Sequence, residues 1–304
     1  MRHHHLGPDH AQTAFRPETP PALSVAPGET VRIETSAAPV EALFAAGERW
    51  LDRLDVGTLN VVTGPVRIEG VEPGDAVSVE ILAVEPGPWG WNASIPGFGP
   101  VSDRLPGPLL RRHPIRDGFV ELSDRLRIPL RPMVGCLGLA PAEGGTSILS
   151  PPMPWGGNYD LVQARPGSTL LFPAQVAGGL FSLGDLHAAM GANEATSVAI
   201  ECAGAATVRL GLRPGLRLTT PRIETADRLY TVGLKPHGRF LEARKQALGQ
   251  MWDLLVGEAG LAPEEAYGVL SAAVEVELGG PAGMVVLASV ARSLLPGQGV
   301  GREA

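Results

Sequence analysis

The stretch Pro65-Val-Arg-Ile-Glu-Gly-Val-Glu-Pro-Gly-Asp-Ala-Val-Ser-Val-Glu-Ile-Leu-Ala-Val-Glu-Pro-Gly87 decides the fold class of this chain. Apolar residues alternate with polar ones on both sides of the turn sequence Glu72-Pro-Gly-Asp75, and the apolar set is Val66, Ile68, Val77, Val79 and Ile81. A period of two gives each strand one apolar face, and Pro-Gly favours a tight turn. The stretch therefore predicts two half-buried β-strands joined by a turn.

The same strand and turn signals recur along the chain. Residues 22–34 alternate around Pro27-Gly28, and residues 165–173 lead from Pro166-Gly167 into a short apolar strand. Further strand signals cover residues 119–128, 135–140, 208–218, 271–278 and 284–290. The chain is therefore expected to be rich in short strands.

Helical spacing is confined to a few regions. Residues 39–53 have apolar side chains at helix-like intervals, and a later stripe contains Phe240, Ala243, Ala247, Leu248, Met251, Leu254 and Leu255. Pro263 followed by two glutamates opens another helix, because acids are favoured in a first turn. We expect an α+β fold that is predominantly β, a sandwich-like or barrel-like scaffold with two late helices.

We expect three parts that form one continuous globular unit. Residues 1–27 are polar and Pro-rich and predict an irregular N-terminal tail. Residues 28–218 carry the strand signals of the β-rich scaffold, and residues 219–304 form a C-terminal α+β part packed on it.

Composition supports a globular chain with many turns. Gly (39) and Pro (29) make up 68 of the 304 residues, about 22% against a usual level of roughly 12%. Hydrophobic residues make up 44%, which a disordered chain would not carry. The excess of Gly and Pro therefore indicates tight turns between short strands.

Charge and apolar runs exclude several classes of protein. The formal net charge is −7 without a basic stripe, so we expect no nucleic-acid partner. No apolar stretch approaches the roughly 20 residues that span a bilayer, and the N-terminus lacks the order of a signal peptide. The two cysteines cannot build a disulfide framework. A soluble, cytoplasmic protein is expected.

The sequence Ser182-Leu-Gly-Asp-Leu-His-Ala-Ala189 carries the most informative chemistry. Asp185 and His187 stand two residues apart, so on an extended segment both side chains project from one face. A carboxylate and an imidazole that meet at one point suit a divalent metal. Four of the seven histidines lie within the first ten residues, which leaves few others for chemistry. Ordinary surface polar residues are the alternative interpretation of this pair.

Other acids offer further candidate sites. Glu143 stands between a Pro-Ala sequence and a Gly pair, where it could face a cavity or be a solvated turn residue. Asn158 and Asp160 follow the Gly156-Gly157 pair, which lets backbone approach a ligand or form a β-turn. Glu201 follows three apolar residues, so its carboxylate is expected to be partly buried and to need a partner. That partner could belong to a functional site, or a structural salt bridge could supply it equally well.

Nucleophilic mechanisms find less support in the sequence. Cys136 and Cys202 lie in apolar surroundings, and Lys235 and Lys245, the two lysines, lie in or just before the late helix. No Gly-x-Ser-x-Gly elbow, phosphate-binding loop or dinucleotide fingerprint is present. Metal-assisted hydrolysis is the chemistry that survives this elimination.

Several ordered motifs resemble the acetamidase/formamidase family from about Val31 to Leu295. The matching stretches are Val62-Thr-Gly-Pro65, Glu69-Gly70, Glu72-Pro-Gly-Asp75, Trp89-Gly-Trp91, Ile95-Pro-Gly-Phe-Gly99, Ile128-Pro-Leu-Arg-Pro132, Gly138-Leu-Ala-Pro-Ala-Glu143, Gly156-Gly-Asn-Tyr-Asp160 and Ser182-Leu-Gly-Asp-Leu-His-Ala-Ala189. The resemblance implies a β-rich fold, hydrolysis of short-chain amides to carboxylate and ammonia, a divalent metal such as zinc or calcium, and a homodimer.

The resemblance also implies roles for particular residues. Asp185, His187 and Glu201 would bind the metal, and Glu143 and Asp160 would be the catalytic carboxylates, with Glu143 as general base. Residues near the substrate would be Asn158, Trp155 and Met190.

The chain departs from the family pattern at positions near these residues. Trp155 stands where the family has His, and Met190-Gly-Ala-Asn-Glu194 replaces Gln-Gly-Asp-Gly-Glu. The late Ala-Gly-Asp-Leu element is Ala273-Val-Glu-Val276 here. These changes put substrate choice, metal occupancy and activity in question.

We interpret the chain as a metal-dependent amidohydrolase whose partner is a small linear amide. Two other hypotheses remain open. One is a catalytically lapsed binding or structural homologue, indicated by Trp155, Met190 and Ala192, and the other is an amidase for a larger, more apolar amide with Trp155 and Met190 lining an enlarged site.

Overall fold

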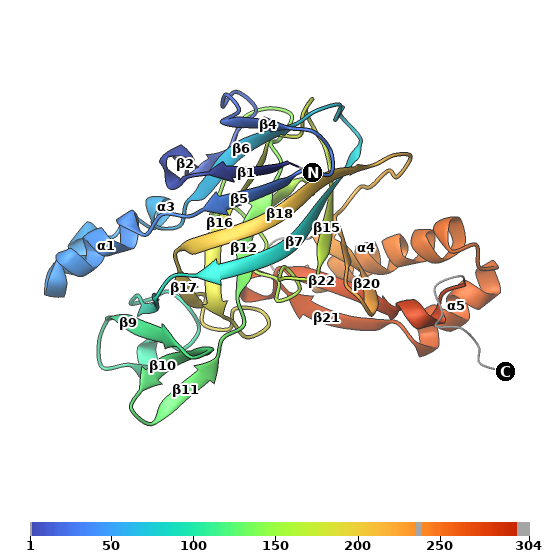
Figure 1. Ribbon diagram of the computed structural model, residues 1–304. Helices are drawn as coiled ribbons and strands as arrows, with labels where there is room; N and C mark the ends of the chain where they lie inside the picture. Colours follow the sequence, from blue (N-terminus) through green and yellow to red (C-terminus); the bar gives the residue numbers. More distant parts are fainter. Residues whose placement is uncertain (1, 235–238, 297–304) are drawn as a thin grey trace.

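The computed structural model describes residues 2–234 and 239–296 and is built on two large β-sheets (Figure 1). The first sheet has nine strands in the order β1-β5-β18-β7-β15-β19-β20-β22-β21. Its strands are β1 (His3–Leu6), β5 (Thr30–Glu34), β7 (Ala76–Pro86), β15 (Thr169–Pro173), β18 (Gly204–Arg213), β19 (Arg222–Glu224), β20 (Arg228–Leu234), β21 (Glu275–Gly279) and β22 (Val285–Ala291).

The second sheet has eleven strands. They are β2 (Ala11–Gln12), β4 (Leu23–Val25), β6 (Val62–Ile68), β8 (Trp89–Ser94), β9 (Leu109–Arg116), β10 (Phe119–Ser123), β11 (Leu126–Pro129), β12 (Met133–Gly138), β14 (Gly156–Asn158), β16 (Phe181–Ala189) and β17 (Ile200–Cys202). A separate small sheet pairs β3 (Ala14–Phe15) with β13 (Thr146–Ser147). The predicted α+β fold with predominantly β structure is confirmed.

The main hydrophobic core lies between the two large sheets. In Figure 1, β7 and β18 of the first sheet cross in front of β12 and β16 of the second. Val79 and Ile81 of the first sheet share one buried cluster with Val134 and Leu183 of the second. Alternate residues of β7 are buried in this way, as expected from the period of two. Strands β6, β12 and β16 are instead buried along nearly their whole length, because other parts of the chain cover their second face.

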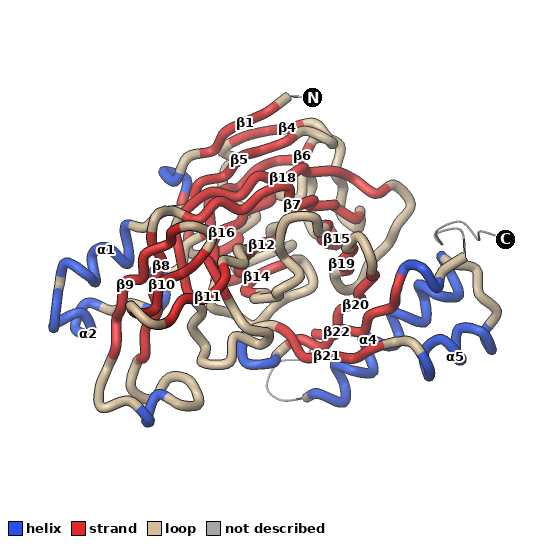
Figure 2. The backbone as a smooth tube through the Cα atoms, turned by 60° about the horizontal axis from the view of Figure 1, so that its bottom comes forward, coloured by secondary structure: helices blue, strands red, loops and turns tan. Residues whose placement is uncertain are grey.

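Helices cover the ends of the sheets rather than their centre (Figure 2). The short α1 (Ala38–Ala45), α2 (Trp50–Arg53) and α3 (Val56–Leu59) lie at one end, within the predicted helical region and just after it. At the other end α4 (Phe240–Asp253) packs on β20 and β22, and α5 (Pro263–Ala272) follows a π-helical turn, Leu254–Glu258. Both late helices are confirmed, and the apolar stripe of α4 forms a second core with these strands.

Two expectations differ from the structure. Residues 1–27 were expected to be an irregular tail, but β1, β2 and β3 lie within them, and β1 pairs in parallel with β5. Backbone pairing is possible there because the polar side chains of β1 stand at a sheet edge, where solvent accepts them. Strands β4 and β5 lie within the strand signal predicted for residues 22–34. The strand predicted over residues 271–278 starts later, at Glu275. Its first residues belong to α5, because Pro263 and the two acids after it start that helix and the helix continues to Ala272.

One edge of β16 is divided between two partner strands. Residues Leu183 and Gly184 pair with β6, whereas Leu186 and His187 pair with β17. Asp185 stands at the division with a φ of 55°, in the left-handed region. The change of partner opens the sheet at this residue, and β12 continues unbroken along the other edge of β16.

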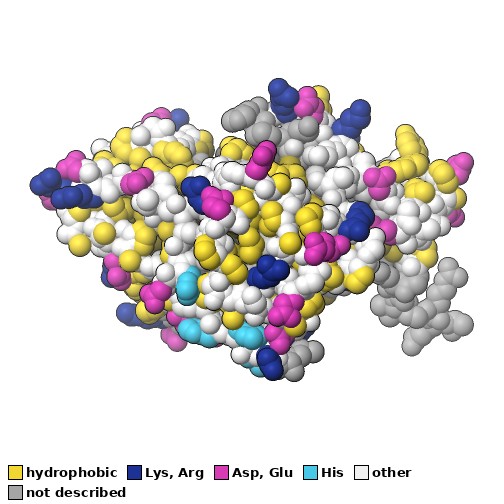
Figure 3. Space-filling view, turned by 90° about the horizontal axis from the view of Figure 1, so that it is seen from above, with side chains coloured by type: hydrophobic (Ala, Val, Ile, Leu, Met, Phe, Trp, Pro, Cys, Tyr) yellow, Lys and Arg dark blue, Asp and Glu magenta, His cyan; other side chains and the backbone are white. Residues whose placement is uncertain are grey.

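Charged side chains are spread over the surface. Figure 3 shows Lys, Arg, Asp and Glu interspersed with apolar side chains on one face. Within the described part of the chain, none of the helices has the length and apolar character needed to cross a membrane.

Close packing of α4 on β20 should make Gly233 intolerant of a side chain. A Cβ at Gly233 would collide with the backbone of Ala243 in α4, whereas a Cβ at Gly249, on the exposed side of α4, would meet nothing within 4 Å. We expect Gly233→Ala to destabilise the protein by about 1–3 kcal/mol and Gly249→Ala to stabilise it by up to about 1 kcal/mol. Urea denaturation followed by circular dichroism measures both, and equal midpoints would contradict this packing.

Candidate metal and catalytic site

Strand β16 brings Asp185 and His187 to the same place, as the two-residue spacing predicts. The Nε2 atom of His187 lies 3.5 Å from Oδ1 of Asp185. The positive φ of Asp185 turns its backbone out of regular strand geometry, so the pair lies at the opening of the sheet rather than on a flat strand face.

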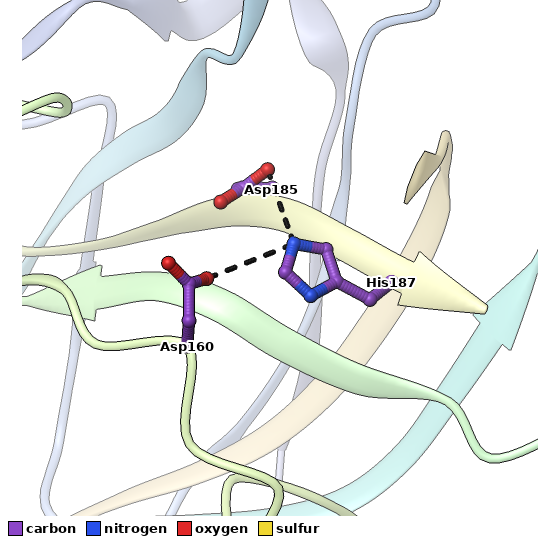
Figure 4. Close-up of side chains that lie close together, drawn as sticks. All are labelled: Asp160, Asp185 and His187. Atoms are coloured by element: carbon purple, nitrogen blue, oxygen red, sulfur yellow. Dashed lines mark ion pairs between the residues drawn. The ribbon is translucent and has the colours of Figure 1, made fainter. Parts of the chain in front are cut away.

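Two more acids reach His187 from other strands. Asp160 follows β14, and its Oδ1 lies 3.7 Å from Nε2 of His187. Glu201 stands directly opposite His187 on β17, and its Oε2 lies 3.3 Å from the same nitrogen. Figure 4 shows the carboxyl groups of Asp160 and Asp185 directed toward the imidazole. Three carboxylates and one imidazole therefore converge on one point.

These side chains are buried, and several of their polar atoms have no hydrogen-bond partner. His187, Asp160, Asp185 and Glu201 expose between 1% and 5% of their side-chain surface. Among the described residues, Oδ1 of Asp160, Oδ1 of Asp185 and both ring nitrogens of His187 lack a hydrogen bond. Unpaired buried polar atoms are costly, so this donor set fits a bound divalent cation.

Glu194 extends the group. His187, Glu194 and Glu201 each offer a ligand atom, and these atoms lie within 4.8 Å of one another, as do those of Asp160, Asp185 and His187. Glu194 has a φ of 43° and Asp160 a φ of 40°. Three of the four acids therefore hold left-handed backbone conformations, which non-glycine residues rarely adopt outside functional sites.

Gly135 of β12 leaves the space in which the carboxylates meet. The pairing register places Gly135 opposite Asp185. A Cβ at this position would lie 2.6 Å from Oδ1 of Asp160 and 2.6 Å from Oδ2 of Asp185. Any side chain here would occupy the position between the two carboxyl groups.

Burial and mutual repulsion shift the protonation of the acids. Burial, with the charge of Asp185, raises the pKa of Asp160 to about 8, and burial, with the charge of Asp160, raises the pKa of Glu194 to about 9. Burial raises the pKa of Glu201 to about 7 against the opposing influence of His187. Burial opposes the charge of His187, but Glu201 and Asp185 outweigh it and raise its pKa well above the usual value. The protein alone leaves this cluster short of positive charge.

A cavity of about 280 Å³ ends at this group. Asp160, Asp185, Glu194 and Glu201 line it together with Asn158. Oδ1 of Asn158 accepts a hydrogen bond from Sγ of Cys136 at 3.1 Å, which leaves its NH₂ group as the free donor. Asn158, predicted to bind the substrate, and Asp160, predicted to be catalytic, both line this cavity.

Three other predicted site residues lie outside this cavity. Glu143 is exposed on the loop after β12. Trp155 donates its indole N–H to Oγ1 of Thr146, packs on the main core and does not line the cavity. Met190 lines a separate hollow of about 490 Å³ that shares Glu194 and Val198 with the first cavity.

The sequence did not single out Gly135 or give Glu194 a role. A glycine inside a strand signals close approach of other atoms, which was the available clue for Gly135. Glu194 is the one residue at the end of the altered segment 190–194 that keeps the acid of the family pattern. The loop that brings its side chain back to His187 could not be predicted from the sequence.

The cysteines and lysines do not supply a nucleophile at this site. Burial raises the pKa of the Cys136 thiol well above its usual value and raises that of Cys202 as well, so both stay protonated. Lys245 lies on α4 and lines no part of the cavity, and Lys235 lies outside the described residues.

The chain is similar in sequence to known formamidases and acetamidases. A formamidase from Methylophilus methylotrophus is 27% identical over 259 residues, which cover 65% of this chain and 63% of the relative. The chain thus matches less than two thirds of that relative's length.

Solved structures match over nearly the whole chain. A recombinant predicted acetamidase/formamidase from the thermophile Thermoanaerobacter tengcongensis is 28% identical with a TM-score of 0.89, covering 98% of this chain and 99% of that one. An acetamidase from Bacillus halodurans is 30% identical with a TM-score of 0.85, covering 94% and 97%. The model of the acetamidase/formamidase family matches residues 5–146 and 142–295. The chain therefore belongs to the acetamidase/formamidase family.

Proposed function

We propose that this protein hydrolyses a carboxamide to a carboxylate and ammonia with the help of one divalent cation. The observation that carries the proposal is the set of unpaired buried ligand atoms of Asp160, Asp185 and His187 at the end of a cavity. Family membership and the names of the similar proteins support amide hydrolysis as the reaction.

Asp160, Asp185, His187 and Glu201 would hold the cation. An imidazole among carboxylates suits zinc, whereas calcium prefers six to eight oxygen ligands, so zinc is the proposed metal. When bound, it would polarise the amide carbonyl and lower the pKa of a water molecule.

Glu194 is the proposed proton carrier in place of Glu143. It lines the cavity, and its carboxylate lies close to His187 and Glu201. Burial and the neighbouring acids raise its pKa to about 9, and a bound cation would offset that repulsion and favour the carboxylate that accepts a proton. Water adds to the carbonyl carbon as Glu194 takes its proton. The C–N bond then breaks as Glu194 gives that proton to the leaving nitrogen, and Asn158 can donate a hydrogen bond to the substrate.

The hypothesis of a lapsed homologue loses its motivation in this structure. It depends on Trp155, Met190 and Ala192, and none of the three lines the cavity that ends at the carboxylates. The acids and Asn158 that the proposed mechanism uses all line this cavity.

Removal of a proposed ligand should remove the metal. We expect Asp185→Asn to lower zinc affinity by about 100-fold or more, because one negative ligand is lost. The matched control is Asp117→Asn, since Asp117 also has a positive φ (50°) but is exposed on a turn. Isothermal titration and elemental analysis measure the change, and equal zinc content in both variants would contradict this ligand assignment.

Occupation of the space beside Gly135 should have a related effect. In Gly135→Ala the new Cβ forces the carboxyl groups of Asp160 and Asp185 apart, so zinc affinity should fall by at least about 10-fold. Gly107→Ala is the control, because a Cβ there meets nothing within 4 Å. Circular dichroism checks that both variants are folded, and a folded Gly135→Ala protein with unchanged affinity would argue against this site.

Two glutamine variants separate the candidate bases. Glu194→Gln should lower kcat for acetamide by about 10²–10⁴-fold, because proton transfer is lost, while zinc content stays above half of the wild-type value. Glu143→Gln should stay within about twofold of wild type, because Glu143 is exposed outside the cavity. The reverse result, measured by ammonia release, would restore Glu143 as the base.

A further inference from the structure

The site cavity has two ends of opposite chemistry. One end carries the four acids and Asn158, whereas the rest of the wall is mainly apolar. The apolar side chains used below are Trp91, Ala93, Ile95, Phe98, Leu149 and Met284. A polar end that fixes one group and an apolar wall that holds the remainder is the usual construction of a small-molecule site.

Strand β8 joins these two ends. Trp91, Ala93 and Ile95 stand at intervals of two residues, so their side chains share one face of an extended segment. Trp91 pairs directly with Glu201 of the acidic group. The apolar wall therefore begins beside the proposed ligands and leads away from them.

The wall lacks a cationic side chain. No Lys, Arg or His is among the described residues that line this cavity. A charged group on the part of the substrate away from the amide would lie on an apolar wall without a cationic side chain to pair with it, so the part of the substrate along the wall must be uncharged.

The cavity is large for the smallest amides. Its volume of about 280 Å³ approaches the roughly 300–1,000 Å³ of pockets that hold drug-sized ligands, which are several times larger than formamide or acetamide. Formamide and acetamide, bound at the acidic end, would leave the apolar wall in contact with water, and removing that contact is favourable.

Exposed apolar residues continue the wall to the surface. Val56, Phe98 and Leu149 line the cavity and are 39%, 45% and 44% exposed. They come from α3, the loop after β8 and the loop after β13, so residues remote in sequence form one apolar rim. A contiguous exposed apolar surface marks an interaction site.

We propose that the substrate is a neutral carboxamide with an apolar acyl group longer than that of acetamide, and that Ala93 and Leu149 set its accepted size. This inference rests on the proposed amide hydrolysis. The amide group lies at the Asp185 end, and the acyl chain follows β8 toward Leu149.

The test measures binding and hydrolysis separately on the zinc-loaded full-length protein. Saturation-transfer NMR titrations give dissociation constants for acetamide, butyramide and hexanamide, and the same spectra record the carboxylate formed. We expect affinity to rise by about fourfold for each added methylene group, and succinamate, which carries a carboxylate, to bind no better than acetamide.

Two variants address the wall from opposite directions. In Ala93→Leu the larger side chain fills part of the cavity, so the affinity for hexanamide should fall by at least about 10-fold. The affinity for acetamide should change by less than about twofold. Leu149→Ala removes an apolar contact and should weaken hexanamide binding by about threefold or more. Leu126→Ala, an equally conservative change at a 55% exposed leucine of β11 outside this cavity, should change neither.

Each outcome decides one question. Acetamide binding as tight as hexanamide binding, or an Ala93→Leu variant with an unchanged affinity series, would overturn the inference. If light scattering gives the Leu149→Ala variant a different molar mass from the wild type while its amide affinities are unchanged, the rim contacts a second copy of the chain instead. If the affinity series appears without any carboxylate formed, the cavity inference stands and the proposed hydrolysis fails.

Discussion

Negative charge concentrated around one buried imidazole is the constraint on which this structure depends. Asp160, Asp185 and Glu201 all approach Nε2 of His187 within 3.7 Å, and Glu194 stands beside them in a space that solvent hardly reaches. Such a cluster is unfavourable unless a cation or bound protons offset it. The pKa values of Asp160 and Glu201 are raised, so bound protons can supply part of that compensation, and the unpaired ligand atoms indicate where a cation would supply the rest.

The two sheets create this cluster by interrupting the edge of one strand. Strand β16 exchanges β6 for β17 at Asp185, and the missing backbone pairing leaves room for a cavity whose wall is β8. Left-handed backbone at Asp160, Asp185 and Glu194 costs conformational energy that the packed sheets on either side must support. The same interruption therefore provides both the polar end of the site and access to it.

Local sequence signals predicted the elements that depend on near neighbours. Alternation in residues 65–87 gave two strands and their turn, the stripe from Phe240 to Leu255 gave α4, and the spacing of Asp185 and His187 placed both in one site. The N-terminal strands differed from expectation, because β1 forms only by pairing with β5, which is remote in the sequence. The end of α5 also differed, because helix and strand compete for the same residues there.

The sequence by itself determined a β-rich fold, the pair of residues at the centre of the site and the resemblance to an amidase family, because each is written in short-range patterns or ordered motifs. Only the tertiary structure decided which distant acids join that pair. It brought Asp160, Glu194 and Glu201 to His187, left Glu143 exposed and Trp155 outside the cavity, and placed Gly135 beneath the carboxylates. The physical reason is that strand pairing and close packing act between residues remote in the chain, and spacing along a sequence carries no information about those distances.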